Sequence, residues 1–216
     1  MTIDYDSMST SAASSKLNKN TSLLKRLAVS TFEPVSIQRA KHNSNIADSE
    51  KAFDAFFADC IKAARDYIER QLGCCICEAS YTLSLSKFPT YAIPIPVWPV
   101  AAVASITYKD TDNANQTVTF GTIVQPVNDD RYTIYLTDWA AFPTARSTPN
   151  AITISFTAGW ASQDVIPPSI ARAALMLVSY WFENREAVLI GSISKETEFS
   201  VNALLDSVRP GEDNLE

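Results

Sequence analysis

The sequence has little of what enzymes usually need. Its 216 residues include one histidine, His42, and no carboxylate stands at a spacing that predicts a partner for it. Because a catalytic imidazole is normally oriented by a partner, we expect a solvated surface histidine. No serine lies in a G-x-S-x-G elbow, and the five glycines form neither a phosphate-binding loop nor a dinucleotide fingerprint. The sequence therefore predicts no enzymatic activity and no cofactor.

An excess of positive charge and a long hydrophobic run are also absent. The 18 basic and 24 acidic residues give a net charge of −6, whereas proteins that bind nucleic acid through its phosphates are usually basic. The longest apolar stretch, residues 166–182, contains two prolines and Arg172, and a membrane span needs about 20 mostly apolar residues. The polar first thirty residues lack the apolar centre of an export signal. We expect a protein made in the cytoplasm, with no membrane contact.

The four cysteines do not have the spacing of a zinc site. Cys74 and Cys75 are adjacent, Cys77 follows closely, Cys60 lies upstream, and His42 is farther away still. Zinc sites usually combine separated pairs of cysteine or histidine ligands that can form a tetrahedron. The sequence therefore predicts free thiols and no metal.

Two pairs of aspartates invite a calcium hypothesis. Asp110 with Asp112, and Asp129 with Asp130, lie between segments of strand pattern, but neither pair matches the spacing of a calcium-binding loop. Aspartate is also a common turn residue, because its side chain accepts hydrogen bonds from nearby backbone N–H groups. Turns are the favoured interpretation.

Helical periodicity marks three segments. Residues 36–43 follow Pro34, with Ser36 as a candidate cap, and residues 50–72 place apolar side chains three or four positions apart up to Gly73. A third helix follows the two prolines at 167–168 and is apolar nearly all round through residues 170–185. Such a helix must be buried on more than one side, so we expect it to contact both the 50–72 helix and the β-rich part.

Between these helices the pattern changes to the alternation of half-buried strands. Five segments show it: residues 81–86, 103–108, 116–120, 132–136 and 151–156. Turn-forming segments separate them, and no helical pattern intervenes, so the strands should be antiparallel. Pro94, Pro96 and Pro99 cannot donate hydrogen bonds to a sheet, which restricts their segment to an edge or a crossover.

The predicted fold class is α+β. A small helical bundle, made of two N-terminal helices and a long buried C-terminal helix, carries an inserted antiparallel β subdomain. The expected parts are a flexible N-terminal extension (1–28), the helical part (29–78), the β insert (79–160), the buried helix (165–187) and a C-terminal docking tail (188–216).

The aromatic side chains of the β insert allow several interpretations. Trp98, Trp139 and Trp160 lie in or beside its loops. They can close the small β core, contact a neighbouring protein, or stack on sugars or bases, and the sequence leaves these alternatives open.

The acidic tail holds one apolar cluster. Its members are Val201, Leu204, Leu205 and Val208, followed by Arg209. Because so short a patch cannot fold alone, it must dock on its own domain or on a partner.

Seven sequence blocks, taken in order, resemble the head–tail connector (adaptor, or head-completion) proteins of tailed bacteriophages, in the longer form with a β insert. The blocks are EPVSIQRAK (33–41), IKAARDYIERQLG (61–73), IPVWPVAAVASITYKD (95–110), ISFTAGW (154–160), VIPPSIARAALMLV (165–178), ENRE (183–186) and ALLDSVRP (203–210). Residues 1–28 have no counterpart in the family pattern.

The resemblance implies a structural virion protein in the neck, at the portal vertex. Family members form a ring, typically of twelve copies, that connects capsid to tail and extends the DNA channel. The implied partners are the portal protein, a stopper or tail protein, and further copies of the chain, with the genome passing through without sequence-specific binding. An acidic wall suits this passage because it repels DNA. The resemblance also assigns portal docking to the tail near residues 200–216.

Other functions stay open on the sequence alone. The chain can instead be a β-rich binding module for carbohydrate or another virion protein, another neck protein such as a stopper or tail terminator, or a hydrolase with an unrecognised site. Glycan binding or a loss of activity without His42 would discriminate the first and last of these.

Overall fold

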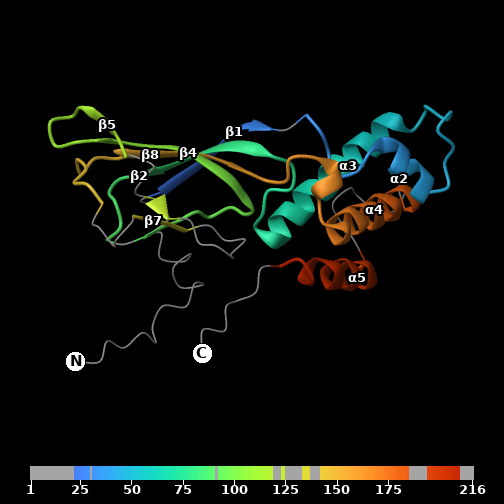
Figure 1. Cartoon of the computed structure of the whole chain (residues 1–216). Coiled ribbons are helices and arrows are strands. Elements are labelled where there is room, and N and C mark those ends of the chain that lie inside the picture. The colour runs from blue at the N-terminus through green and yellow to red at the C-terminus, as the bar shows by residue number, and fades with distance from the viewer. Residues whose placement is uncertain are drawn as a thin grey trace, which may run out of the picture. The chain divides into compact units, whose positions relative to one another are not determined.

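The computed structural model describes residues 22–29, 31–90, 92–118, 123–124, 133–136, 142–184 and 194–209. The chain divides into two compact units, a β unit and a helical unit (Figure 1). The β unit contains the described residues of 1–29 and 79–159, and the helical unit contains those of 30–78 and 160–209.

The helical unit is built from two chain segments. Its described elements are α2 (Ile37–Asn43), α3 (Asp54–Leu72), the 3-10 turn η3 (Gln163–Val165), α4 (Pro168–Glu183) and α5 (Lys195–Asp206). Ser36 caps α2, because its side-chain oxygen accepts a hydrogen bond from the backbone N–H of Arg39 at 3.2 Å. Gly73 ends α3 with a φ of 64°, which a residue with a side chain rarely adopts. Both ends agree with the prediction from the sequence.

The core of this unit lies between α3 and α4. Phe57 of α3 stacks on Phe182 of α4 with ring centroids 4.9 Å apart, and Phe53 meets the same ring edge-on at 5.5 Å. Leu175 and Trp181 of α4 are also buried. The predicted contact between these two helices is confirmed, whereas the expected contact of α4 with the β-rich part stays a prediction.

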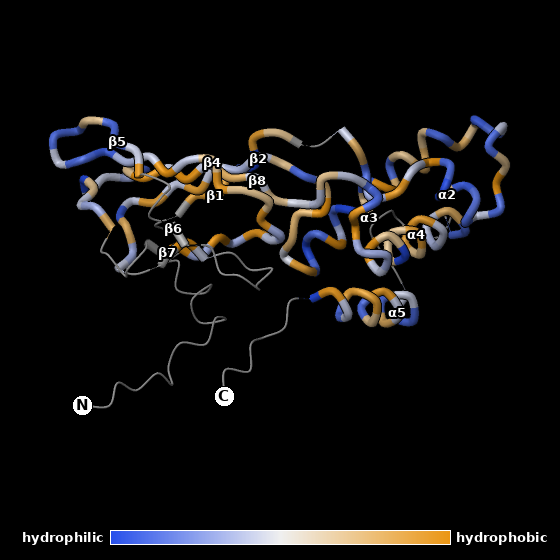
Figure 2. The backbone as a smooth tube through the Cα atoms, viewed as in Figure 1, coloured by the Kyte–Doolittle hydropathy of each residue, from blue (hydrophilic) through white to orange (hydrophobic). Residues whose placement is uncertain are grey.

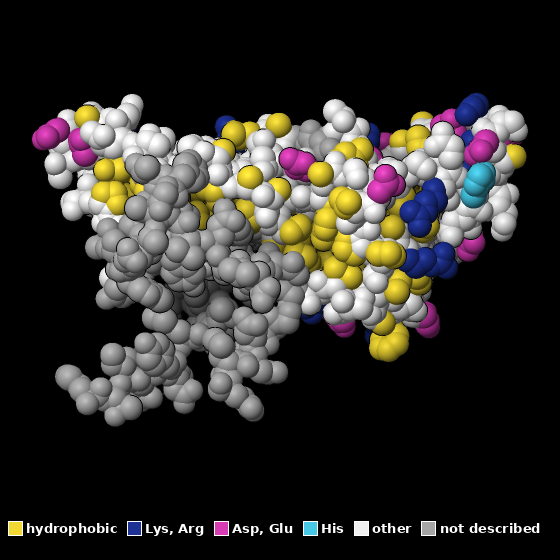
Figure 3. All heavy atoms as spheres, viewed as in Figure 1, with side chains coloured by type: hydrophobic (Ala, Val, Ile, Leu, Met, Phe, Trp, Pro, Cys, Tyr) yellow, Lys and Arg dark blue, Asp and Glu magenta, His cyan; other side chains and the backbone are white. Residues whose placement is uncertain are grey.

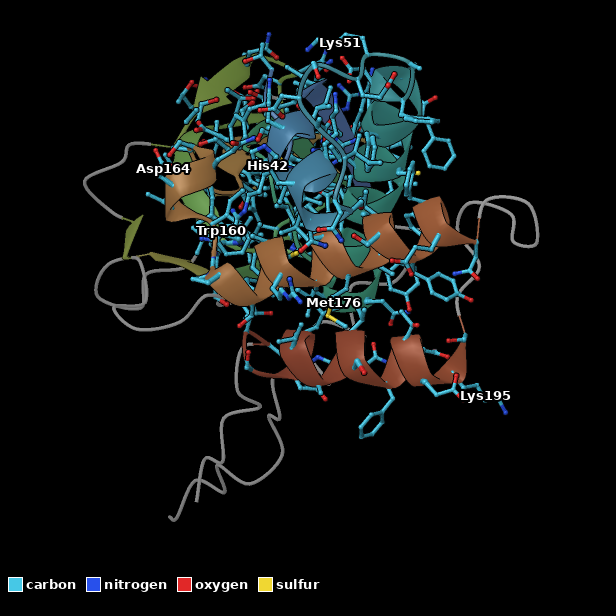
Figure 4. All side chains as sticks on the ribbon, turned by 90° about the vertical axis from the view of Figure 1, so that its right-hand side faces the viewer. His42, Lys51, Trp160, Asp164, Met176 and Lys195 are labelled. Atoms are coloured by element: carbon cyan, nitrogen blue, oxygen red, sulfur yellow. The ribbon has the colours of Figure 1, made fainter. Side chains whose placement is uncertain are left out.

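Helix α5 packs on α4 and completes the helical unit. The two helices run side by side in opposite directions, and the Met176 side chain lies between them (Figure 4). Ser207, just after α5, donates a hydrogen bond to Ser169 near the start of α4 at 3.1 Å. Hydrophobic and hydrophilic residues alternate along α5 (Figure 2), and its inward residues Val201 and Leu205 are fully buried. For these two side chains, docking on the chain's own domain is what the structure shows.

The β unit contains two antiparallel sheets. The described strands are β1 (Ser22–Val29), β2 (Ala79–Leu85), β3 (Ala92–Pro94), β4 (Val100–Lys109), β5 (Asn115–Thr117), β6 (Ile123–Val124), β7 (Thr133–Leu136) and β8 (Ile152–Ala158). The larger sheet has the order β1-β2-β8-β4-β5 and the smaller one β3-β7-β6. The antiparallel pairing agrees with the prediction.

The centre of the larger sheet has one buried face. Strands β2 and β8 pair from Ala79 opposite Ala158 to Leu85 opposite Ile152, and every second residue of each is buried. Tyr81 stacks on Phe156 across this pair at 5.4 Å. The alternation of the sequence therefore describes these strands correctly, since strand side chains point to opposite faces in turn.

One segment differs from the sequence expectation and another agrees with it. Residues 22–28 were expected in a flexible extension, but they form β1, an edge strand paired with β2. Only the preceding 21 residues of that extension lie outside the described part. Within the proline-rich segment, residues 92–94 form β3, and Pro94 lies opposite Thr133 on an edge strand, as its missing N–H requires.

Candidate interaction surfaces

The first resemblance block is held to the second by an ion pair. A terminal guanidinium nitrogen of Arg65 on α3 donates to both carboxylate oxygens of Glu33, at 2.7 and 2.8 Å. Arg65 also pairs with Asp66 at 3.2 Å. Burial raises the pKa of Glu33, and the opposing effect of Arg65 is smaller. These charges serve the internal structure of the helical unit and do not form an accessible site.

Lys41 is the one buried charged residue in the described part of the chain, with 1% of its surface exposed. Its ammonium group donates to the backbone carbonyl of Asp48 at 3.2 Å, to the carbonyl of Glu50, and to a carboxylate oxygen of Asp54 at 2.8 Å. The hydrogen bond from Lys41 holds the pKa of Asp54 below its usual value. By binding carbonyls of the 48–50 segment, Lys41 keeps it out of a helix, which explains why α3 begins at Asp54 and not near Glu50 as predicted.

The four cysteines are free and buried. Burial raises the pKa of Cys60 to about 11 and that of Cys77 to about 12, and it raises the pKa of Cys74 further. The Cys75 thiol donates to the carbonyl of Cys77 at 3.1 Å. A buried thiol whose pKa is raised in this way is protonated at neutral pH and is a poor nucleophile.

His42 lies on the surface, where its ring is visible in cyan (Figure 3). Its Nε2 atom is 3.2 Å from a carboxylate oxygen of Asp48, and both side chains are exposed. The sequence had not predicted this partner. A solvent-exposed pair of this kind contributes little to stability.

Asp110 shapes the turn between β4 and β5. One of its carboxylate oxygens accepts hydrogen bonds from the N–H groups of Asp112 and Ala114, and the other accepts from the Gln116 side chain at 2.9 Å. These bonds, Gln116 first, lower the pKa of Asp110. The turn interpretation is confirmed for Asp110, while Asp129 and Asp130 lie outside the described residues.

The two described tryptophans of the three singled out by the sequence lie in different units. Trp98 is 5% exposed and belongs to the core of the β unit. Trp160 belongs to the helical unit, where its backbone N–H donates to the carbonyl of Ile76 at 3.0 Å and its carbonyl accepts from Glu78. Trp139 lies outside the described residues. Trp98 is therefore not available for stacking on a sugar or a base.

The predicted docking cluster has an inner and an outer part. Val201 and Leu205 are buried, Leu204 and Val208 are half-buried, and Arg209 is exposed beside Asp206 at 3.4 Å. Most of the apolar area of this cluster is thus used within the helical unit.

A different set of apolar side chains is exposed. In the described part of the chain these are Leu23, Leu24 and Leu27 of β1, Val165 of η3 and Phe199 of α5. Figure 3 shows hydrophobic side chains reaching the surface over α5. None of the five was predicted as an interaction residue, although the position of Phe199 opposite Val201 and Leu205 on a helix was a visible signal.

The residues that the structure describes offer exposed apolar surfaces for contact. No group of three or more histidine, cysteine or acidic side chains among them is placed to hold a metal ion. In the same residues, no helix combines the length and apolar character that crossing a bilayer requires. The polar groups described above instead make hydrogen bonds and ion pairs within one unit or the other.

Comparison with known proteins agrees with this structural character. The family model for "Head completion protein" (HCP) matches residues 35–198. A chain from "Neck of empty GTA particle computed with C6 symmetry" superimposes with a TM-score of 0.71 and 21% identity, covering 87% of this chain and 95% of that one. A chain from "Neck of native GTA particle computed with C12 symmetry" gives 0.66 and 21%, with 87% and 94% covered.

A chain from the virion of a native gene transfer agent particle gives a TM-score of 0.69 at 20% identity, with the same coverage as the first. No curated protein matches the sequence. At these identities the solved structures establish the fold, and the family match extends over most of the chain. The chain therefore belongs to the Head completion protein family.

Proposed function

We propose that this chain is a structural subunit of a ring beneath the portal, in the neck that connects a virion head to its tail. The observation that carries the proposal is the family match over residues 35–198. The neck chains of similar fold, from particles computed with C6 or C12 symmetry, support a ring of repeated copies. The role is structural and the chain carries out no reaction of its own.

The proposed neighbours are the portal protein on one side and a stopper or tail protein on the other. A ring of twelve copies would extend the DNA channel, and the genome would pass through it without sequence-specific binding. The net charge of −6 supports this passage, because an acidic chain does not bind phosphate backbones tightly.

The direct test is to locate the chain in assembled particles. We expect electron microscopy of particles carrying a tagged full-length chain to place the tag between head and tail, in several copies around the axis. Particles assembled without the chain should be filled heads that lack tails. A tag found on the outer capsid or the distal tail would overturn the proposed function.

The C-terminal segment is proposed to dock on the portal protein. Because Val201 and Leu205 are buried within the helical unit, the docking contribution must come from the accessible Arg209, from the half-buried Leu204 and Val208, or from residues beyond them. A truncation after Ser200 would damage α5, so a chain ending at Arg209 is the cleaner variant.

This truncation has a matched control at the other end of the chain. We expect a chain ending at Arg209 to bind the portal protein more weakly than the full chain, with an unchanged unfolding temperature. A chain lacking residues 1–21 should bind normally. Equal portal binding by the full chain and both truncated chains would remove residues 210–216 from the interface.

A further inference from the structure

Two exposed stripes of this chain, one in each unit, have complementary chemistry. The β1 stripe consists of Leu23, Lys25 and Leu27, and the α5 stripe consists of Glu196, Phe199 and Ala203. All six side chains are exposed. Three of them, Leu23, Leu27 and Phe199, are among the large apolar residues that the described structure leaves in solvent.

Leu23 and Lys25 of the β1 stripe lie on the face of the larger sheet opposite to its buried face. Leu23 pairs with Ser84 and Lys25 with Thr82 on β2, whereas the buried residues of β2 alternate with these. Leu27 lies in a β-bulge, where the register of β1 with β2 shifts. Leu23 and Leu27 are each 58% exposed. Because β1 is the edge of the sheet, an uncovered apolar strand there would favour uncontrolled association.

The α5 stripe lies on the side of the helix that faces away from α4. Val201 and Leu205 are fully buried on the inner side, and residues three and four apart share a face of a helix, which places Glu196, Phe199 and Ala203 together on the outer side. Phe199 is 77% exposed. An aromatic side chain held on a rigid helix in this way is typical of a binding anchor.

We infer that the α5 stripe of one copy docks on the β1 stripe of the next copy in the ring. The inference rests on the proposed function, and it names the contact that joins neighbouring subunits. Phe199 inserts between Leu23 and Leu27 of the neighbour, and Glu196 approaches Lys25. The contact removes the apolar groups of both stripes from water, and the opposite charges of Glu196 and Lys25 fix its orientation.

The pairing of two different surfaces is what a ring requires. A contact between unlike patches is heterologous, so a growing assembly keeps one free stripe of each kind, one at either end, and can continue until it closes. A second copy is the favoured occupant because the same chain carries both stripes, with basic charge on one and acidic charge on the other.

Complementation between two variants tests this contact. We expect Leu23→Glu and Phe199→Glu each to weaken self-association of the purified full chain by about tenfold or more, because each places a charge at an apolar anchor. Mixed together, they should form a two-chain species and nothing larger, since one intact stripe of each kind remains. Sedimentation velocity measures all three samples, at concentrations up to about 1 mM.

A charge exchange provides the second arm. Lys25→Glu and Glu196→Lys should each weaken association, and a chain carrying both should regain it, since the pair is restored with its signs reversed. Val165→Glu is the matched control, because Val165 is an exposed apolar residue outside both stripes. It should associate like the unmodified chain, and all variants should keep their unfolding temperature.

The outcomes separate this contact from the ring itself. Association that survives Leu23→Glu and Phe199→Glu would overturn the contact and leave the ring intact. Self-association that is lost with Leu23→Glu but kept with Phe199→Glu would also overturn the contact. The β1 stripe would then bind a segment other than α5, such as residues of the N-terminus. An unmodified chain that stays monomeric up to about 1 mM overturns the contact as well, while the location of the tag in particles tests the proposed function independently.

Discussion

Replacing Lys41 with methionine tests the most deeply buried charge of the described structure. Methionine keeps most of the apolar stem and removes the ammonium group, so the carbonyls of Asp48 and Glu50 lose their shared donor. A part-buried acceptor left without a partner costs about 1–3 kcal/mol, which gives a loss of about 2–4 kcal/mol for the pair after partial access of water. We add no cost for the lost ion pair with Asp54, because its carboxylate is 34% exposed and water can replace the ammonium group there.

The assay is urea unfolding followed by the helical circular dichroism signal, because all described helices belong to the helical unit. Lys51→Met is the matched control. Lys51 is 71% exposed and lies 3.8 Å from the same carboxylate of Asp54, so its loss should change the free energy of unfolding by less than about 0.5 kcal/mol. A Lys41→Met variant as stable as this control would refute the conclusion that Lys41 holds the 48–50 segment in place.

Three further predictions concern the helical unit. Leu175→Ala should lower the free energy of unfolding by about 2–5 kcal/mol in the same assay, because a buried leucine leaves a cavity; a change below about 0.5 kcal/mol would mean that α4 is not core. The pKa of Asp54 is lower in the folded chain than its ordinary value. The ionised Asp54 therefore stabilises the fold above the ordinary pKa, and this stabilisation is lost as the pH falls through the lowered pKa. Asp54→Asn should therefore flatten the stability profile below about pH 4, and an unchanged acid limb in unfolding curves would contradict this. Native Cys60 and Cys77 should react with a thiol reagent at neutral pH only as fast as the chain unfolds, because burial raises their pKa values to about 11 and about 12; rapid labelling of folded protein would show that these thiols are accessible.

Local patterns predicted the α+β class and most elements, because caps and periodicity are local properties of the chain. Ser36 begins α2 through a hydrogen bond from the backbone N–H three residues later, and Gly73 ends α3 through its own positive φ. Alternation identified β2 and β8, whose buried faces follow the period of two. The family resemblance likewise rested on sequence blocks, and the family match over residues 35–198 confirms it.

Only the tertiary structure decided which side chains are internal and which remain for partners. The sequence offered Trp98 and the 201–208 cluster as interaction candidates, but Trp98, Val201 and Leu205 are buried. The local sequence pattern predicted that residues 22–28 are flexible. They are ordered because β1 pairs with β2, which lies fifty or more positions away in the chain. Lysine is usually a surface residue, and the sequence gives no sign that Lys41 is buried. The structure shows its ammonium group bound by Asp48 and Asp54. Burial depends on contacts between remote segments, and a pattern confined to neighbouring residues does not contain that information.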